Sequence, residues 1–366
     1  MRRHVRWGAV LGAALILLPG CWDQRPVEGR ALVEAVGVAP TAQAGVWQWT
    51  FVFPSPTESV NTIGAAPANE IYSITVRART WTGALRIAQQ ETTRDLYFGQ
   101  FRVLALSTRL PATMWGRLIA TFNKSGRILK TFWIVAANPV RGVVQTPPLT
   151  EGTPLYGLFK LLSCHCQPYA WGQRAWQTWD RLTTPGVTPV VPVIRLQSAH
   201  LVQNPQMAVL GSQRLVIWSP TASAGWAYLT QHVVKGGFTV VTPDGPVGLN
   251  RVRGTSDVTL SGIGSPVRVT VRLSYHGNVE DVPDGLVLTP AAKHAIATDA
   301  AQRIQTLAAA AIGAAKEQRV DPFGWHRERA WALNQPGTAW PAPIAWTGWS
   351  VRLLVHFHVT GEGESQ

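Results

Sequence analysis

The chain has 366 residues, of which 46% are hydrophobic, so it is long enough for two or three domains with real cores. Its formal net charge is +13, but the basic residues are scattered without a run of five, which argues against a nucleic-acid partner. No stretch beyond the first 20 residues is long and apolar enough to form a transmembrane helix, which needs about 20 such residues.

The N-terminus has the layout of an export signal. Three arginines precede an apolar run over residues 7–18, which is too short to span a bilayer. The run ends in the sequence Leu-Pro-Gly-Cys at residues 18–21. This pattern predicts a lipoprotein signal peptide over residues 1–20 and lipidation of Cys21, which would hold the mature chain on the outer side of a membrane. The alternative is an ordinary secretory signal that happens to be followed by a cysteine.

The first half of the mature chain alternates predicted strands and helices. Alternating or continuous apolar residues predict the strands, and apolar residues spaced by three and four predict the helices. Thr82 is the expected N-cap of the first helix. The expected strands are 32–38, 46–53, 71–78, 101–107 and 131–137, the expected helices are 83–94, 112–122 and 170–182, and residues 138–157 are expected to form a loop.

A proline-rich connector around residue 190 marks the expected boundary with the second half. A hairpin at 207–218 and strands at 238–241, 258–260 and 267–275 follow. The clearest helix covers residues 290–319, with Thr289 as its cap and Pro290 in its first position. Residues 349–360 alternate as a half-buried strand, which we expect to be antiparallel to its neighbour.

These elements predict an α+β, multi-domain fold with mixed or antiparallel sheets and packed helices. An N-terminal α/β-type region is expected over residues 21–190, and it could hold two subdomains. A C-terminal α+β domain is expected over residues 191–366, with one long helix across a sheet.

The sequence offers few candidates for chemistry, because it contains no nucleophile elbow, zinc-protease motif or phosphate-binding loop. Cys164, His165 and Cys166 could form a disulfide or contribute to a metal site, or they could have no function. His356 and His358 share one face of the last predicted strand, where they could bind a metal but more commonly face solvent. We therefore expect no enzyme activity, no metal and no cofactor.

Two other clusters have alternative interpretations. Glu280, Asp281 and Asp284 could bind calcium, but their spacing matches no known loop and favours a solvated turn. The chain has 17 tryptophans, which suit sugar stacking as well as core or interdomain packing, the commoner role. The aromatic residues considered for stacking are Tyr169, Trp171, Trp176, Trp179, Trp340, Trp346 and Trp349.

Four short stretches of the chain together resemble one known protein family. Residues 21–25 read Cys-Trp-Asp-Gln-Arg, similar to the start of the mature chain in that family. Residues 96–100 look like the family's segment ending in Gly-His, with Gln100 in place of the histidine. Residues 321–325 after the long helix resemble its Asp-x-Phe-Gly pattern, and the last predicted strand runs into Thr360 and Gly361 as expected. The stretches resemble the Ger(x)C family, the lipoprotein C subunits of spore germinant receptors.

The resemblance implies a non-catalytic, lipid-anchored subunit of a nutrient germinant receptor. It would act on the outer face of the spore inner membrane, together with integral membrane A and B subunits. A second hypothesis of another class is a lipid-anchored extracytoplasmic protein that binds a solute or a glycan. In that case two globular halves would form a cleft lined by tryptophans.

Overall fold

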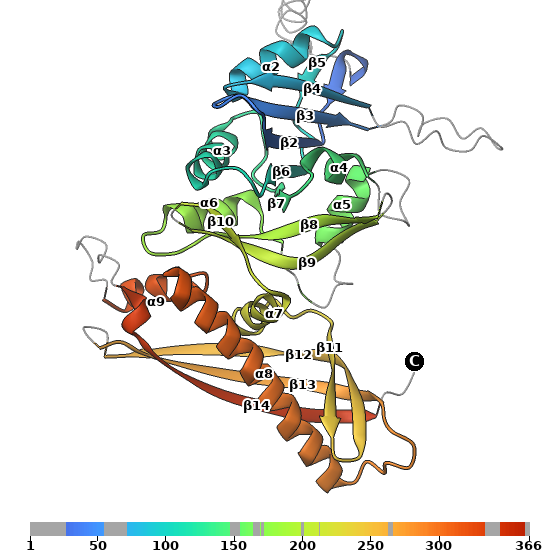
Figure 1. Cartoon of the computed structure of the whole chain (residues 1–366), viewed down its shortest axis with the longest axis vertical. Coiled ribbons are helices and arrows are strands. Elements are labelled where there is room, and N and C mark those ends of the chain that lie inside the picture. The colour runs from blue at the N-terminus through green and yellow to red at the C-terminus, as the bar shows by residue number, and fades with distance from the viewer. Residues whose placement is uncertain are drawn as a thin grey trace, which may run out of the picture.

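The computed structural model describes residues 27–54, 72–146, 154–163, 169, 172–198, 201–211, 213–262, 266–333 and 345–362. These residues form an elongated molecule with a domain at each end (Figure 1). We call the part around an eight-stranded sheet the N-terminal domain and the part around a four-stranded sheet the C-terminal domain.

The N-terminal domain is built on a mixed sheet with the strand order β10-β9-β8-β7-β6-β2-β3-β4. The central strands β2, β6, β7 and β8 run parallel to one another, and the strands at both edges are antiparallel to their neighbours. The strands are β2 (Ala35–Pro40), β3 (Trp47–Phe53), β4 (Tyr72–Ala78), β6 (Val103–Ser107), β7 (Trp133–Ala137), β8 (Val190–Ser198), β9 (Leu201–Leu210) and β10 (Leu215–Ile217).

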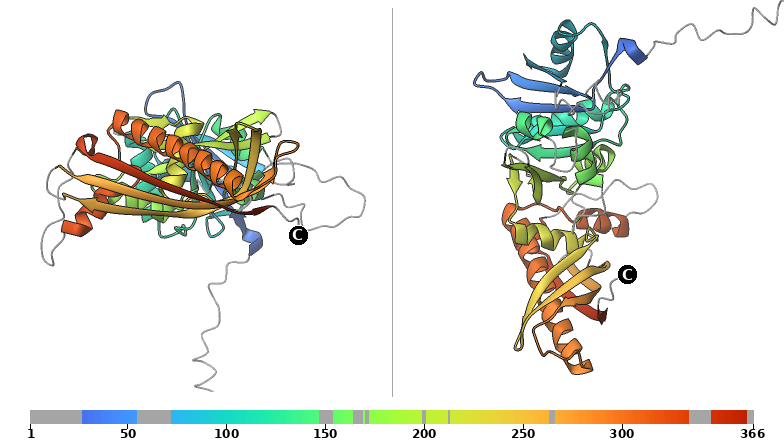
Figure 2. Two further views of the ribbon diagram at one scale, coloured as in Figure 1. Left: turned by 90° about the horizontal axis from the view of Figure 1, so that it is seen from below. Right: turned by 90° about the vertical axis from the view of Figure 1, so that its right-hand side faces the viewer.

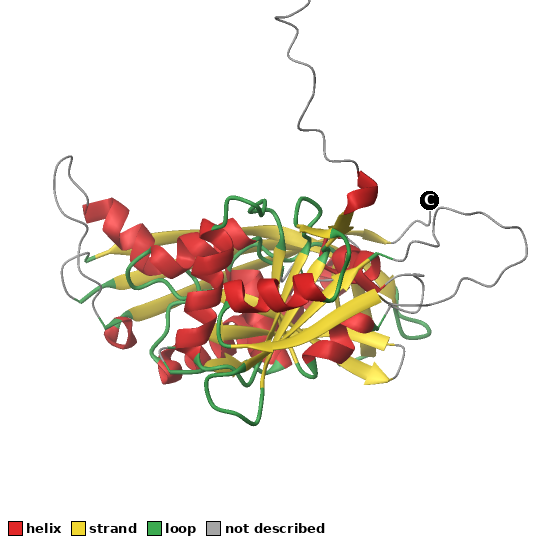
Figure 3. Cartoon of the chain, turned by 90° about the horizontal axis from the view of Figure 1, so that it is seen from above, coloured by secondary structure: helices red, strands yellow, loops and turns green. Residues whose placement is uncertain are grey.

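Helices cover both faces of this sheet, because the central strands are apolar on both sides. One core holds α2, α3 and α6, and a second core on the other face holds α4 and α5. Viewed from the end that carries α2, helices lie on both sides of the fanned strands (Figure 3). The helices are α2 (Trp81–Gln90), α3 (Ala112–Lys124), α4 (Val140–Gln145), α5 (Pro154–Ser163) and α6 (Ala175–Thr183). A separate parallel pair joins β1 (Arg30–Leu32), which follows η1 (Val27–Gly29), to β5 (Asp95–Tyr97).

The C-terminal domain has a sheet with the order β11-β12-β13-β14, and one long helix, α8, lies across one of its faces (Figure 2). The short helix α7 packs beside α8 on the side of the N-terminal domain (Figure 1). The elements are α7 (Pro220–Leu229), β11 (Gly236–Thr242), β12 (Gly245–Ser261), β13 (Arg268–Asp281), α8 (Pro290–Gln318), α9 (Trp325–Leu333), η3 (Trp346–Gly348) and β14 (Ser350–Glu362).

Helix α8 confirms the predicted cap and apolar stripe. The Thr289 hydroxyl accepts a hydrogen bond from the Ala292 amide at 3.2 Å, and Pro290 occupies the first turn. Its 29 residues correspond to about 44 Å of helix. The expected stripe faces the core, with Leu307 partly buried and the others buried: Ile296, Ala300, Ile304, Ala311 and Ala315.

The predicted antiparallel pairing of the last strand is wrong. β14 pairs in parallel with β13, over a register that runs from Arg268 opposite Ser350 to Gly277 opposite Val359. The connection explains the difference, because α8 crosses over between the two strands and returns the chain to the same end of the sheet. Parallel neighbours need such a crossover.

Several helices were missed or misplaced. The first helix begins at Trp81 with Thr80 as its cap, not Thr82, because Thr80 keeps an extended backbone and accepts the Gly83 amide at 3.1 Å. Part of the loop expected at 138–157 forms α4, where three valines spaced by three and four pack under the sheet. Helices α5, α7 and α9 were also not predicted from the sequence.

The predicted α+β class, with several domains, mixed sheets and a long helix against the C-terminal sheet, is confirmed. The hairpin at 207–218 is confirmed as β9 and β10. The domain division at residue 190 stays a prediction; β8 begins at Val190 and belongs to the eight-stranded sheet. Within the described part of the chain, no helix is both long and apolar enough to cross a bilayer.

Helices α7 and α8 touch at Gly225, which predicts a specific sensitivity. A Cβ atom there would lie 1.9 Å from the Leu307 carbonyl oxygen, so an added methyl group must push the helices apart. We expect Gly225→Ala to lower the free energy of unfolding by about 1–3 kcal/mol in urea titrations. Gly313→Ala is the control, because a Cβ on this α8 residue meets nothing within 4 Å. It should raise stability by about 1 kcal/mol, and equal losses in both variants would contradict the packing.

Candidate functional site

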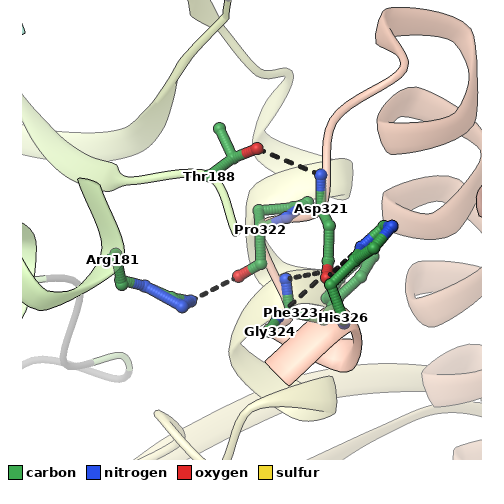
Figure 4. Close-up of polar contacts among 7 residues, drawn as sticks. All are labelled: Arg181, Thr188, Asp321, Pro322, Phe323, Gly324 and His326. Carbon is green, nitrogen blue, oxygen red and sulfur yellow. Dashed lines mark hydrogen bonds and ion pairs between the residues drawn. The ribbon is translucent and has the colours of Figure 1, made fainter. Parts of the chain in front are cut away.

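Asp321, between α8 and α9, is a polar side chain at the domain junction that accepts several hydrogen bonds. It is 1% exposed. One carboxylate oxygen accepts the amides of Phe323 at 3.1 Å and Gly324 at 2.9 Å. The other accepts the His326 amide at 2.8 Å and lies 2.9 Å from His326 Nδ1 (Figure 4). The carboxylate therefore closes a tight turn through the Phe323 and Gly324 amides and accepts the His326 amide in the first turn of α9.

The turn depends on a glycine. Gly324 has φ +87°, a left-handed conformation that side chains rarely adopt. Arg319 ends α8 in the same region of backbone space, with φ 55°. These two reversals bring the chain out of α8, through the turn and into α9.

Hydrogen bonds tie this turn to the N-terminal domain. The Thr188 amide donates to the Asp321 carbonyl at 2.8 Å, and the Asp321 amide donates to the Thr188 hydroxyl at 3.1 Å. Arg181 of α6 donates to the Pro322 carbonyl at 2.6 Å (Figure 4). The same carbonyl accepts the indole N–H of Trp226 at 2.9 Å. We call the turn 321–324 with Thr188 and Arg181 the junction latch.

The cation of the latch is deeply buried. Arg181 is 8% exposed, and its burial lowers the pKa of the guanidinium to about 10, while the charges of Asp321 and Asp180 oppose that shift. Arg181 therefore stays charged at neutral pH. An ion pair also crosses the junction nearby, between Arg327 Nη1 and Asp180 Oδ2 at 2.7 Å.

A buried histidine packs against Trp226, whose indole N–H donates to the turn of the latch. The His232 ring lies 4.4 Å from the Trp226 ring, measured between centroids. Its Nδ1 lies 2.7 Å from the Thr230 carbonyl oxygen. Burial lowers the pKa of His232 to about 4, an effect that the contact with Thr230 partly opposes and the charge of Arg181 reinforces. His232 is therefore neutral at physiological pH.

The tryptophans proposed for stacking have different environments. Trp176 is 54% exposed, whereas Trp179 packs against the N-terminal core. Trp346 and Trp349 are both 3% exposed and belong to the C-terminal core, so packing is their role. Tyr169 packs edge-to-face against Tyr228. Trp171 and Trp340 lie outside the described residues.

The other candidates do not come together as a site. Cys21 and the segment from Cys164 to Cys166 lie outside the described residues. His356 and His358 lie on the exposed face of β14, where His358 is opposite His276. The acidic cluster is exposed at the end of β13 and in the following turn, as Glu280, Asp281 and Asp284. In the described ranges, no three His, Cys, Asp or Glu residues are arranged to hold a metal ion.

The sequence pointed to only one of the residues that form the junction latch. Asp321 was noted as part of a family pattern, but its partners Thr188 and Arg181 were not identified. Thr188 lies in the proline-rich connector, where nothing in the sequence marks a hydrogen-bond partner. Arg181 carries a detectable signal, because it shares the face of α6 that also carries Ala175 and Thr178, both buried.

Two family models match the chain in succession. The model described as "Spore germination protein N-terminal domain" matches residues 23–196. The model described as "Spore germination B3/ GerAC like, C-terminal" matches residues 206–360. The chain belongs to the GerAC-like family of spore germination proteins. The turn of the junction latch lies within the second matched region, and its two partners lie within the first.

Two individual proteins are similar to the chain, one in part of its sequence and one in its fold. "Spore germination protein KC" of Bacillus subtilis (strain 168) is 30% identical over 101 residues, which cover 26% of this chain and 24% of that relative. The alignment thus spans about a quarter of the relative's length. The crystal structure of the GerBC protein matches with a TM-score of 0.54 and 11% identity, covering 90% of this chain and 99% of that one. At this identity the likeness shows the fold alone.

Removing the central carboxylate should weaken the whole protein. Asp321→Ala leaves three backbone amides and the buried His326 without their acceptor, so we expect a loss of about 3–5 kcal/mol in the free energy of unfolding. Asp284→Ala removes an exposed acidic residue and should change stability by less than about 0.5 kcal/mol. Urea titrations of both variants measure the difference, and similar losses would refute the role of Asp321.

His232 should make stability depend on pH. The unfolded chain binds a proton at His232 near pH 6.5, but the folded chain does so only near pH 4. Between these values the unfolded state binds more protons, so stability falls by about 1.4 kcal/mol per pH unit as the pH is lowered. We expect His232→Gln to reduce this slope in urea titrations between pH 7 and 4.5. An unchanged slope would show that His232 is not kept neutral by the fold.

Proposed function

We propose that this protein is a lipid-anchored, non-catalytic subunit of a nutrient germinant receptor. The observation that carries the proposal is the pair of germination-family models that covers the chain from residue 23 to 360, except for a short gap. The family has no known catalysis. Assembly with integral membrane A and B subunits follows from the resemblance to the family's C subunits.

The position of Cys21 supports anchoring at one end of the molecule. Cys21 lies two positions before residue 23, where the match to the first family model begins. It lies fewer than ten positions before β1, the first described strand. Val27 lies six positions after Cys21, and a segment of this length can span about 20 Å at most. A lipid on Cys21 would therefore keep the N-terminal domain beside the membrane, on its extracytoplasmic face. Two or more acyl chains would make this attachment stable.

The elongated shape then gives the two domains different tasks. The C-terminal domain lies at the far end from η1 and β1 (Figure 1). The junction latch keeps it in a fixed orientation relative to the anchored domain. In this proposal the protein is a rigid extracytoplasmic scaffold, which stabilises the A and B subunits or couples them to germination.

The anchor and the partners can be tested in one experiment. Full-length protein with a C-terminal tag is extracted from membranes of its host in mild detergent, and the co-purifying proteins and the N-terminal peptide are identified by mass spectrometry. We expect a diacylated Cys21 and two integral membrane partners. Cys21→Ala should move the chain out of the membrane fraction, while Cys164→Ala, the matched cysteine control, should leave it there.

The lipid anchor and the membrane partners can fail this test separately. An unmodified Cys21 in the wild type would contradict the lipid anchor. A lipidated chain that purifies without membrane partners would contradict the receptor subunit and favour a solitary binding protein.

A further inference from the structure

A groove of about 550 Å³ lies at the junction, and both domains line it. One wall is a single face of α6 and the residues before it: positions 173, 176, 177, 180 and 181 follow helical spacing. The other wall includes Asp257 of β12 and Arg327 and Glu328 of α9. The groove thus shares Arg181 and Phe323 with the junction latch, but it opens to solvent.

The Trp176 side chain is exposed to solvent at this groove. Trp176 is 54% exposed, although its neighbour Trp179 one turn along packs into the core. An indole offers a large apolar ring face, and this face suits the C–H face of a sugar ring. Since Trp176 contributes little to the core, packing does not explain why a tryptophan occupies this position.

Two side chains that line the groove each carry a buried polar atom with no hydrogen-bond partner in the part of the chain that the structure describes. The atoms are Gln173 Oε1, an acceptor, and Arg181 Nε, a donor, on side chains that are 5% and 8% exposed. Buried polar atoms of this kind normally have a partner from the protein, water or a ligand. A hydroxyl group can both donate and accept, so it suits this pair directly or through one ordered water.

The charges of the groove nearly cancel. Its described lining carries three acidic side chains and two arginines, Arg181 and Arg327. His232, which also lines the groove, is neutral because burial lowers its pKa to about 4. Asp180 and Arg327 already pair with each other at 2.7 Å. The balance favours an uncharged ligand over an anion or a cation.

We propose that the junction groove binds a neutral polyhydroxylated ring, the chemistry of a sugar. Trp176 stacks on the ring, and the side chains of Gln173 and Arg181 hydrogen-bond to its hydroxyl groups. The inference goes beyond the receptor-subunit proposal and does not rest on the lipid anchor or on membrane partners. Because both domains line the groove, a bound ring would also brace the domain junction.

The test uses the full-length chain in mild detergent. D-Glucose represents a free sugar, a tetramer of N-acetylglucosamine represents the end of a wall glycan, and L-alanine represents a small zwitterionic ligand. We expect at least one of the two sugars to raise the thermal midpoint in a saturable manner, as mass action requires, and L-alanine to have no effect. A response to D-glucose alone assigns a free sugar, and a response to the tetramer alone assigns a glycan.

Matched tryptophan variants locate the site. Trp176→Ala should weaken sugar binding at least tenfold and leave the thermal midpoint of the unliganded chain unchanged, while Trp176→Phe should restore part of the affinity. Trp331→Ala is the control, because Trp331 is 56% exposed on α9 and is not part of the described groove lining. The proposal is overturned if neither sugar shifts the midpoint, if L-alanine alone does, or if Trp331→Ala weakens binding as much as Trp176→Ala.

Discussion

The carboxylate of Asp321 is the constraint on which the arrangement of the two domains depends. A buried carboxylate is costly unless its oxygens receive hydrogen bonds, and here three backbone amides and one imidazole surround it. These bonds hold the turn after α8 in one conformation. That conformation presents the Asp321 and Pro322 carbonyl oxygens to Thr188, Arg181 and Trp226. The internal order of one turn thus fixes contacts between α6, α7 and the connector.

This arrangement relates the fold to the proposed scaffold function. A membrane-tethered subunit can hold its far domain at a fixed place relative to the membrane only if its two domains keep a defined orientation. Arg181 belongs to two features at once, since its guanidinium group donates to the latch and its side chain also lines the groove. A ligand in the groove would therefore contact the group that joins the domains, and its binding energy would add to the stability of the junction.

Local patterns predicted the elements that have a strong period or a clear cap. The cap at Thr289 and the apolar stripe of α8 follow from helical spacing, and the strands β3 and β14 follow from alternation. Helix α4 has only six residues, too few for a helical period, and α7 is buried on all sides, so its sequence lacks the polar face that would mark a helix. The direction of β14 depends on where α8 returns the chain, which is a property of the whole domain. The contacts at the junction could not be predicted for a similar reason. Thr188 and Asp321 are 133 residues apart in the sequence, and only the folded chain brings them together.

Scanning calorimetry of the full-length chain tests most directly whether the junction latch makes the two domains one unit. If the latch couples them, both domains unfold in a single transition whose calorimetric and van't Hoff enthalpies agree. Two separate transitions in the wild-type chain would show that the domains unfold independently. That result would contradict the account of a rigid scaffold held by Asp321.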